Sequence, residues 1–273
     1  MRPTSRRDFL KYSTRTIAAL SSAATFSHTA RGEHAKRDTA NDKIVFGVIG
    51  LGGRGRDLSA GFARLDDAEV AYLCDVDLGR VGDFPDTIAR EQGGRTPKVV
   101  QDMRRIYDDP DVDAVVIATC DHWHALAAVW ACQAGKDVYV EKPPSHNIWE
   151  GRKMVEAARK YNRVVQAGTQ NRSAPYIHEA AEYIRSGRLG EAPLVKVYNL
   201  KPGGPFRVPE DSPQPEGLDY DMYLGPAPSR PFNEAHFHSG WKKFWAYSGG
   251  DLADDGIHQL DIARLLVGDP AYP

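Results

Sequence analysis

The chain has 273 residues, which is enough for one large domain or two ordinary ones. Hydrophobic residues make up 41% and charged residues 26%, a globular composition, and the formal net charge of -2 argues against a nucleic acid or an anionic membrane as partner. No apolar run reaches the roughly 18 residues of a membrane-spanning helix, so we expect no stable membrane anchor. The three cysteines are too few and too irregular for a disulfide framework or a zinc site.

The first forty residues carry an export pattern. The stretch SRRDFLK, residues 5–11, precedes a mildly apolar run at 17–26, and together they resemble bacterial twin-arginine signal peptides, which the export machinery reads as an address. A disordered basic tail is the alternative. The pattern predicts a periplasmic or extracellular protein, with the cleavage site left open. Because residues 31–42 are polar and lack periodicity, we assign 1–42 to a signal peptide and linker.

The next segment combines a strand, a glycine motif and a helix. The sequence KIVFGVIGLGGRG begins at Lys43 with an apolar run of strand length, and a helical period follows the glycines. Gly50 suits a tight turn, Gly52 allows a pyrophosphate to approach the backbone, and Gly55 allows close packing of helix on strand. This order predicts a dinucleotide cradle at a helix N-terminus.

An acidic residue follows at the distance that a dinucleotide site requires. The next expected strand leads to Asp75, 20 residues after Gly55, where a carboxylate accepts hydrogen bonds from the adenosine ribose. Because a carboxylate there repels a 2'-phosphate, the sequence favours NAD over NADP. Arg80 lies close enough in sequence to compensate, so NADP remains the less favoured alternative.

Strands and helices continue to alternate up to residue 168. Strands are expected at 113–119, 137–143 and 163–168, with helices at 124–135 and 149–161. Short connections between such units predict an α/β fold with a doubly wound parallel (Rossmann) sheet over residues 43–168. Ligands bind at the carboxyl ends of its strands. Polar candidates at those ends are Thr119, His124, Glu141, Lys142 and Gln170.

Two histidines raise the question of a metal. His122 and His124 have the H-x-H spacing of a metal site, but no clear third ligand accompanies them. We therefore predict no metal and assign His124 to packing or cofactor contact.

The second half is less regular. A helix is expected at 174–187 and an alternating strand at 194–200, followed by a proline- and glycine-rich loop or active-site cover at 201–230. Aromatic side chains then gather at Trp241, Trp245 and Tyr247. Their faces suit sugar rings, and simple packing between domains is the equal alternative.

Taken together, GLGGRG, ATCDHWHA, the segment from VYVEKPP to QAGTQNRS, and GGDLADDGIHQLD resemble the Gfo/Idh/MocA oxidoreductases from about Lys43 to the last residue. The resemblance implies that Lys142 approaches the nicotinamide and the substrate hydroxyl, and that Asp254 and His258 complete the site. It also adds Gly53 and Arg54 to the cofactor contacts and Arg172 to the substrate contacts.

The chemistry fits these residue types. Oxidation of a hydroxyl by hydride transfer needs a base for the hydroxyl proton, and a histidine suits that role. Asp254 and His258 are four residues apart, so one helical turn can present both. A core histidine with a helix-capping aspartate is the alternative.

The resemblance also bears on the second domain. Family members continue into a large open sheet, of which this chain offers one convincing strand, so residues 169–273 are expected to form an incomplete α+β second domain of a C-terminally truncated chain. A homo-oligomer remains open.

Export and a dinucleotide together predict a tightly held cofactor, because free NAD is scarce outside the cytoplasm. A sugar, polyol or glycoside hydroxyl is then either oxidised in alternation with reduction of a carbonyl compound, or oxidised transiently during glycoside elimination, as in the NAD-dependent glycosidases. A non-catalytic carbohydrate-binding protein or inactive fragment is the third alternative.

Overall fold

The computed structural model describes residues 43–200 and 204–268, and the export pattern at 5–11 lies outside them. Its centre is a sheet of six parallel strands in the order β3-β2-β1-β4-β5-β6. The strands are β1 (Ile44–Ile49), β2 (Ala68–Cys74), β3 (Lys98–Val100), β4 (Ala114–Ile117), β5 (Asp137–Glu141) and β6 (Val165–Gly168). The order reverses between β1 and β4, and this switch point is where a crevice opens in such sheets.

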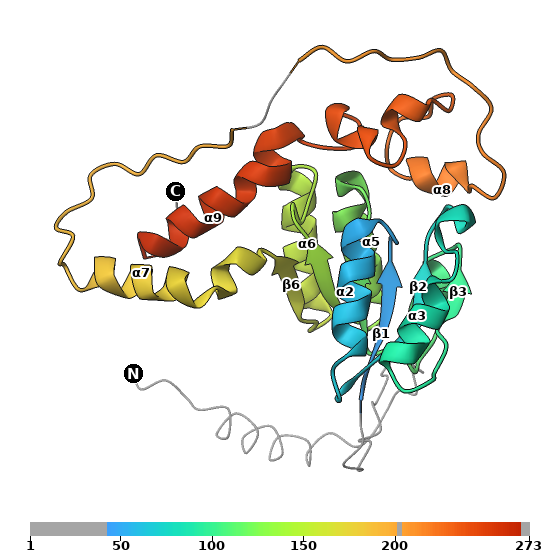
Figure 1. The fold of residues 1–273 in the computed structure, drawn as a ribbon, viewed down its shortest axis with the longest axis horizontal. Coiled ribbons are helices and arrows are strands. Elements are labelled where there is room, and N and C mark those ends of the chain that lie inside the picture. The colour runs from blue at the N-terminus through green and yellow to red at the C-terminus, as the bar shows by residue number, and fades with distance from the viewer. Residues whose placement is uncertain (1–42, 201–203, 269–273) are drawn as a thin grey trace, which may run out of the picture. The chain divides into compact units, whose positions relative to one another are not determined.

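Helices cover both faces of the sheet (Figure 1). They are α2 (Gly53–Ala63), α3 (Phe84–Glu91), α4 (Arg104–Tyr107), α5 (Asp121–Gln133) and α6 (Ile148–Lys160). Side chains of β1 alternate between two cores, because Phe46 and Val48 pack with α2 and α3 while Val45 and Ile49 pack on the face of α5 and α6. The doubly wound Rossmann sheet predicted from the sequence is therefore confirmed.

One predicted helix starts earlier than expected. Helix α5 begins at Asp121 rather than at His124, so both histidines of the H-x-H pattern lie in its first turn. Cys120 has extended backbone angles and so marks the boundary, and the carboxylate of Asp121 is favourable beside the positive end of the helix dipole.

The second half is helical and irregular in the part that the structure describes. It contains α7 (Pro175–Arg185), α8 (Tyr220–Leu224), a π-helical turn at Leu252–Gly256 and α9 (Ile257–Leu266), which packs against α7. A third core gathers around α8 and contains Leu218, Tyr220, Tyr223, Leu224, Phe232, Phe237 and Tyr247.

Two expectations for this half are wrong. Residues 194–200 form no strand, since no described segment pairs with them, and Leu194 and Leu200 are 68% and 90% exposed. An alternating pattern makes a segment fit for a sheet, but a strand also needs a hydrogen-bonded neighbour. The proline-rich segment is not wholly irregular either, because the Asp219 carboxylate accepts a bond from the Met222 N–H and begins α8. None of the described helices has the length and apolar character needed to cross a bilayer.

Candidate active site

The glycine motif forms a close-packed turn between β1 and α2. Gly50 has φ +89°, and a Cβ there would lie 2.6 Å from the Ala118 carbonyl oxygen. A Cβ on Gly55 would lie 1.8 Å from the Gly50 oxygen, so only glycine lets the helix approach the turn. Gly53 instead faces open space, since a Cβ there would meet nothing within 4 Å, and a Cβ on Gly52 would meet only Arg80 Nη2, at 3.8 Å. These residues fit a pyrophosphate, because open backbone lies at the helix N-terminus.

Asp75 follows β2 directly and is 8% exposed. One carboxylate oxygen accepts the Leu51 N–H at 2.7 Å and the other accepts the Asp77 N–H at 2.9 Å. Burial raises the pKa of this carboxyl group, and the two backbone bonds only partly offset that effect. Asp75 is thus held beside the glycine turn, where the ribose hydroxyls of a dinucleotide would lie.

A cavity of about 360 Å³ opens at the carboxyl ends of β1, β2, β4 and β5. Most of the predicted site residues line it: Gly50, Gly52, Gly53, Arg54, Asp75, Thr119, His124, Glu141, Lys142, Trp241 and Asp254. Its wall therefore joins the cofactor half to the second half of the chain.

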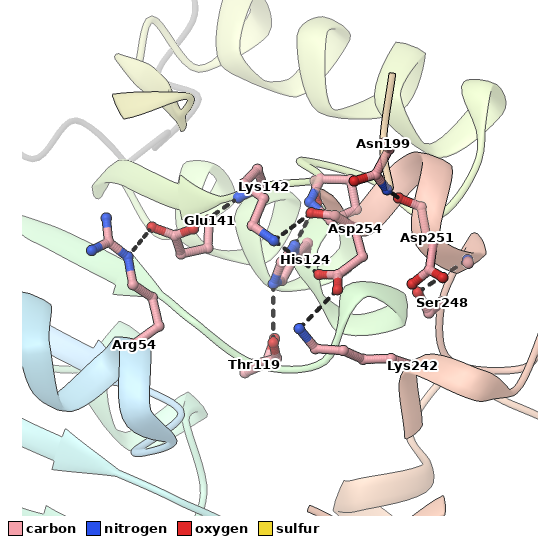
Figure 2. Close-up of polar contacts among 12 residues, drawn as sticks. Arg54, Thr119, His124, Glu141, Lys142, Asn199, Lys242, Ser248, Asp251 and Asp254 are labelled. Atoms are coloured by element: carbon pink, nitrogen blue, oxygen red, sulfur yellow. Dashed lines mark hydrogen bonds and ion pairs between the residues drawn. The ribbon is translucent and has the colours of Figure 1, made fainter. Parts of the chain in front are cut away.

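The two halves meet in an ion pair between Lys142 and Asp254 (Figure 2). Lys142 Nζ lies 2.8 Å from Asp254 Oδ1 and also donates to the Asp254 backbone carbonyl. Lys242 Nζ lies 2.8 Å from the other carboxylate oxygen, so one buried carboxylate bridges two lysines. Burial alone would raise the pKa of Asp254, but hydrogen bonds from both lysines hold it below its ordinary value.

His258 lies one turn beyond Asp254, at the start of α9. It is half-buried, and its Nδ1 is buried without a hydrogen-bond partner among the described residues. Burial, followed by the positive charge of Lys142, lowers the pKa of His258. The imidazole is therefore neutral near pH 7 and able to accept a proton, although the side chain does not line the cavity.

Glu141, at the end of β5, forms an ion pair with α2. Its carboxylate accepts from Arg54 Nε at 2.7 Å and from the Tyr139 hydroxyl at 3.2 Å, as Figure 2 shows for the arginine. The Glu141 side chain is 6% exposed and that of Arg54 40%. The pair connects α2, which follows the glycine turn, to the end of β5, which Lys142 directly follows.

His124 holds the turn that follows Lys142. Its ring is 1% exposed and lies between two backbone carbonyls, with Nδ1 at 2.6 Å from the Pro143 oxygen and Nε2 at 3.2 Å from the Thr119 oxygen. His122 points elsewhere, because its Nε2 donates to the Tyr223 carbonyl at 3.1 Å. The two histidines thus serve separate contacts.

Six predicted site residues lie off the cavity wall: Gly55, Gln170, Arg172, Trp245, Tyr247 and His258. Arg172 instead forms an ion pair with Asp261, with Nε 2.8 Å from Oδ2. Trp245 is 80% exposed, whereas Tyr247 is fully buried in the third core. Of the three aromatic residues predicted to face a sugar, the structure places only Trp241 in the cavity. Gln170 lies in a 3-10 turn after β6.

Two family sequence models match this chain. One is described as "Oxidoreductase family, NAD-binding Rossmann fold" and covers residues 44–169, and the other as "Oxidoreductase family, C-terminal alpha/beta domain" and covers residues 206–273. Both are models of one family, and together they span well over half of the sequence. The chain belongs to the Gfo/Idh/MocA oxidoreductase family.

Curated Gfo/Idh/MocA-like relatives include dehydrogenases of polyols. Inositol 2-dehydrogenase 2 of Saccharopolyspora erythraea is 33% identical over 81% of this chain and 53% of its own length. Myo-inositol 2-dehydrogenase of Thermotoga maritima is 25% identical over 82% of this chain and 54% of its own length. The solved structure "Levoglucosan dehydrogenase, complex with NADH" shares the fold with a TM-score of 0.57 at 24% identity, covering 83% of this chain and 54% of that one. The chain spans about half the length of the curated relatives it matches.

Some cavity residues of this family member are not predictable from local sequence patterns alone. Lys242 is absent from the predicted site, although a lysine pair within the aromatic stretch GWKKFW is a visible signal. His238 also lines the cavity, where it contacts Arg80 and Asp77. No local signal identifies it, since its partners lie roughly 160 residues earlier in the chain.

Proposed function

We propose that this chain acts in an NAD-dependent oxidoreductase whose substrate is a hydroxyl of a sugar, polyol or glycoside. The observation that carries the proposal is the ion pair of Lys142 and Asp254 in the wall of the cavity that begins at the glycine turn. The names of the inositol and levoglucosan dehydrogenases among its relatives support this substrate class.

The residues of the first half would hold the cofactor. Backbone N–H groups at Gly52 and Gly53 would face the pyrophosphate, and Asp75 would accept hydrogen bonds from the adenosine ribose. The negative charge of Asp75 favours NAD over NADP. When bound, the nicotinamide supplies a hydride acceptor for the carbon that bears the reacting hydroxyl.

Lys142 is suited to hold the substrate oxygen. Two of its ammonium protons are engaged by Asp254, which leaves one for the hydroxyl. As the hydroxyl loses its proton, the ammonium stabilises the negative charge that develops on oxygen. Asp254 keeps the lysine in place and Lys242 in turn neutralises Asp254. Neutral His258 lies off the cavity wall and is the group able to take the proton through Lys142, and a positioned base contributes roughly 100- to 10,000-fold.

We further propose that the protein is exported from a bacterial cell and binds its NAD so tightly that the cofactor is not released between catalytic cycles. The support is the order Ser-Arg-Arg-x-Phe-Leu-Lys at residues 5–11, in a part of the chain outside the described residues. An exported enzyme without access to free NAD has to regenerate NAD+ within its own site in each cycle, by passing the hydride from NADH either to a second carbonyl compound or back to the oxidised substrate.

The decisive experiment is nucleotide analysis of the purified protein. After extensive dialysis the protein is denatured, and released NAD(H) is measured per chain. We expect a near-stoichiometric yield, followed by turnover on a panel of sugars, polyols and glycosides. Dependence on an added carbonyl acceptor indicates alternating oxidation and reduction, whereas glycoside cleavage without net redox change indicates the glycosidase. Sugar binding with neither nucleotide nor turnover would overturn the proposal.

A further inference from the structure

Three polar side chains from distant parts of the chain meet at one end of the cavity. Arg80 Nη1 lies 2.7 Å from His238 Nδ1, and His238 Nε2 lies 3.1 Å from Asp77 Oδ2. Asp77 and Arg80 follow β2, whereas His238 belongs to the second half and has the unusual backbone angle φ +52°. We name this trio the ribose-end latch. All three of its residues line the cavity.

The hydrogen-bond partners define the protonation state of the histidine. A guanidinium only donates, so Nδ1 of His238 accepts from Arg80, and Nε2 carries the proton that is donated to Asp77. The latch therefore requires a neutral imidazole. Burial, followed by the positive charge of Arg80, lowers the pKa of His238, and the carboxylates of Asp77 and Asp75 only partly offset this.

A second set of contacts between the two halves lies beside the latch. Residues 217–219 run along residues 76–78, with an antiparallel bridge between Asp77 and Leu218. The Asp219 N–H donates to the Val76 carbonyl at 2.9 Å. The Gln101 side chain donates to the carbonyls of both Val76 and Gly217 at 2.8 Å. Segments from the second half are thus bound to the loop that follows β2 at two places.

The latch lies where the adenosine part of the dinucleotide would bind. Arg80 Nη2 is 3.8 Å from the position that a Cβ on Gly52 would occupy, and Asp75 contributes to the same wall. Phe237, His238 and Ser239 line this end of the cavity from the second half. A dinucleotide seated on the glycine turn would therefore share the cavity with residues 237–239.

We propose that Asp77, Arg80 and His238 form a latch that holds residues 237–239 over the adenosine end of the cavity and slows the release of NAD. This inference rests on the proposed function, because it concerns how the same site keeps its cofactor. His238 acts here as a positioning residue for the cover and takes no part in hydride transfer.

The latch should open at acidic pH, because its hydrogen bonds require a neutral His238. A protonated His238 cannot accept from Arg80, and two positive charges would then face each other. Because the pKa of the histidine is lowered, the latch is still complete at the ordinary histidine value of about 6.5 and opens as the pH falls through the lowered pKa of His238. NAD release should accelerate over that range.

The test measures release of NAD rather than turnover. The full chain is loaded with NAD and diluted, and the nucleotide still bound is quantified over time at pH 7.5 and pH 5. We expect His238→Ala to release NAD at least about tenfold faster than wild type at pH 7.5, as loss of two charged hydrogen bonds implies. His238→Gln, whose amide can both accept and donate, should retain NAD at both pH values. His178→Ala, at an exposed position on α7, is the matched control.

The outcomes separate this inference from the proposed function. If wild type binds NAD and His238→Ala releases NAD no faster than wild type does, the latch is wrong and the proposed function stands. If wild type never binds NAD, both are overturned. Should His238→Ala fail to fold, as judged by circular dichroism, the comparison of wild type with His238→Gln decides. If NAD release is faster at pH 5 than at pH 7.5 in wild type but not in His238→Gln, the latch is supported. If acid accelerates NAD release equally in both proteins, the latch is overturned.

Discussion

Lys142 and Asp254 lie 112 residues apart in the chain, yet their side chains meet at 2.8 Å, with exposed fractions of only 15% and 1%. The pair joins the cofactor half to the helical second half at the point where the proposed reaction takes place. Because the Asp254 carboxylate also contacts Lys242, removing Lys142 leaves it with a remaining positive partner.

The first prediction concerns Lys142→Met. Turnover on the best substrate should fall at least about 100-fold, since the group that stabilises the developing oxyanion is gone. NAD retention should persist because the glycine turn and Asp75 are untouched. Steady-state kinetics and nucleotide content test this, with the exposed Lys153→Met as control. Unchanged turnover would remove Lys142 from the mechanism.

The second prediction compares two glycines of one motif. Gly55→Ala places a Cβ 1.8 Å from the Gly50 oxygen and should push α2 off the turn, lowering both stability and NAD affinity. Gly53→Ala meets no atom within 4 Å and should leave stability equal or raise it by up to about 1 kcal/mol. Denaturant unfolding of both variants measures their free energies of unfolding, and an equal loss of stability in the two variants would contradict the prediction.

The third prediction concerns the Arg54–Glu141 ion pair. Arg54→Met leaves a carboxylate of 6% exposure without its cation and should lower the free energy of unfolding by about 1 to 2 kcal/mol, discounted because Arg54 is itself partly exposed. Adding Glu141→Gln should recover part of that loss. A double-mutant cycle by urea unfolding measures the coupling, and additive effects would show that the pair contributes nothing.

The fourth prediction separates the aromatic residues. Trp241→Ala should raise the KM for substrate, because this side chain lines the cavity. Trp245→Ala should leave the KM unchanged, because its ring is 80% exposed and lies off the cavity wall. Kinetics of both variants on one substrate test this, and the reverse ranking would refute the placement.

The fifth prediction concerns pH and His122. Burial lowers the pKa of this histidine from 6.5 to about 4. Between these two pH values His122 is protonated in the unfolded chain but neutral in the folded chain. The stability that His122 contributes is therefore complete above pH 6.5 and falls as the pH drops toward 4. Between pH 7 and pH 5 the loss should be about 2 kcal/mol. His122→Gln should lack this component in unfolding experiments at the two pH values.

The sequence predicted well those features that depend on neighbours along the chain. The glycine turn, Asp75 and the parallel strands are all recognisable because a strand, a turn and a helix follow one another within about 30 residues. The strand at 194–200 was wrong for the opposite reason, since alternation says nothing about whether a partner strand exists. Lys242 and the ribose-end latch depend on contacts between distant segments, which a local pattern does not encode.

The order of the strands has a consequence for how the protein is made. Every strand of the sheet lies between residues 44 and 168, whereas Asp254 and His238 come from segments that leave the ribosome later. Because domains generally fold in the order of their synthesis, the dinucleotide cradle can form before its cover exists. NAD would then enter an open site, and segments synthesised later would enclose it.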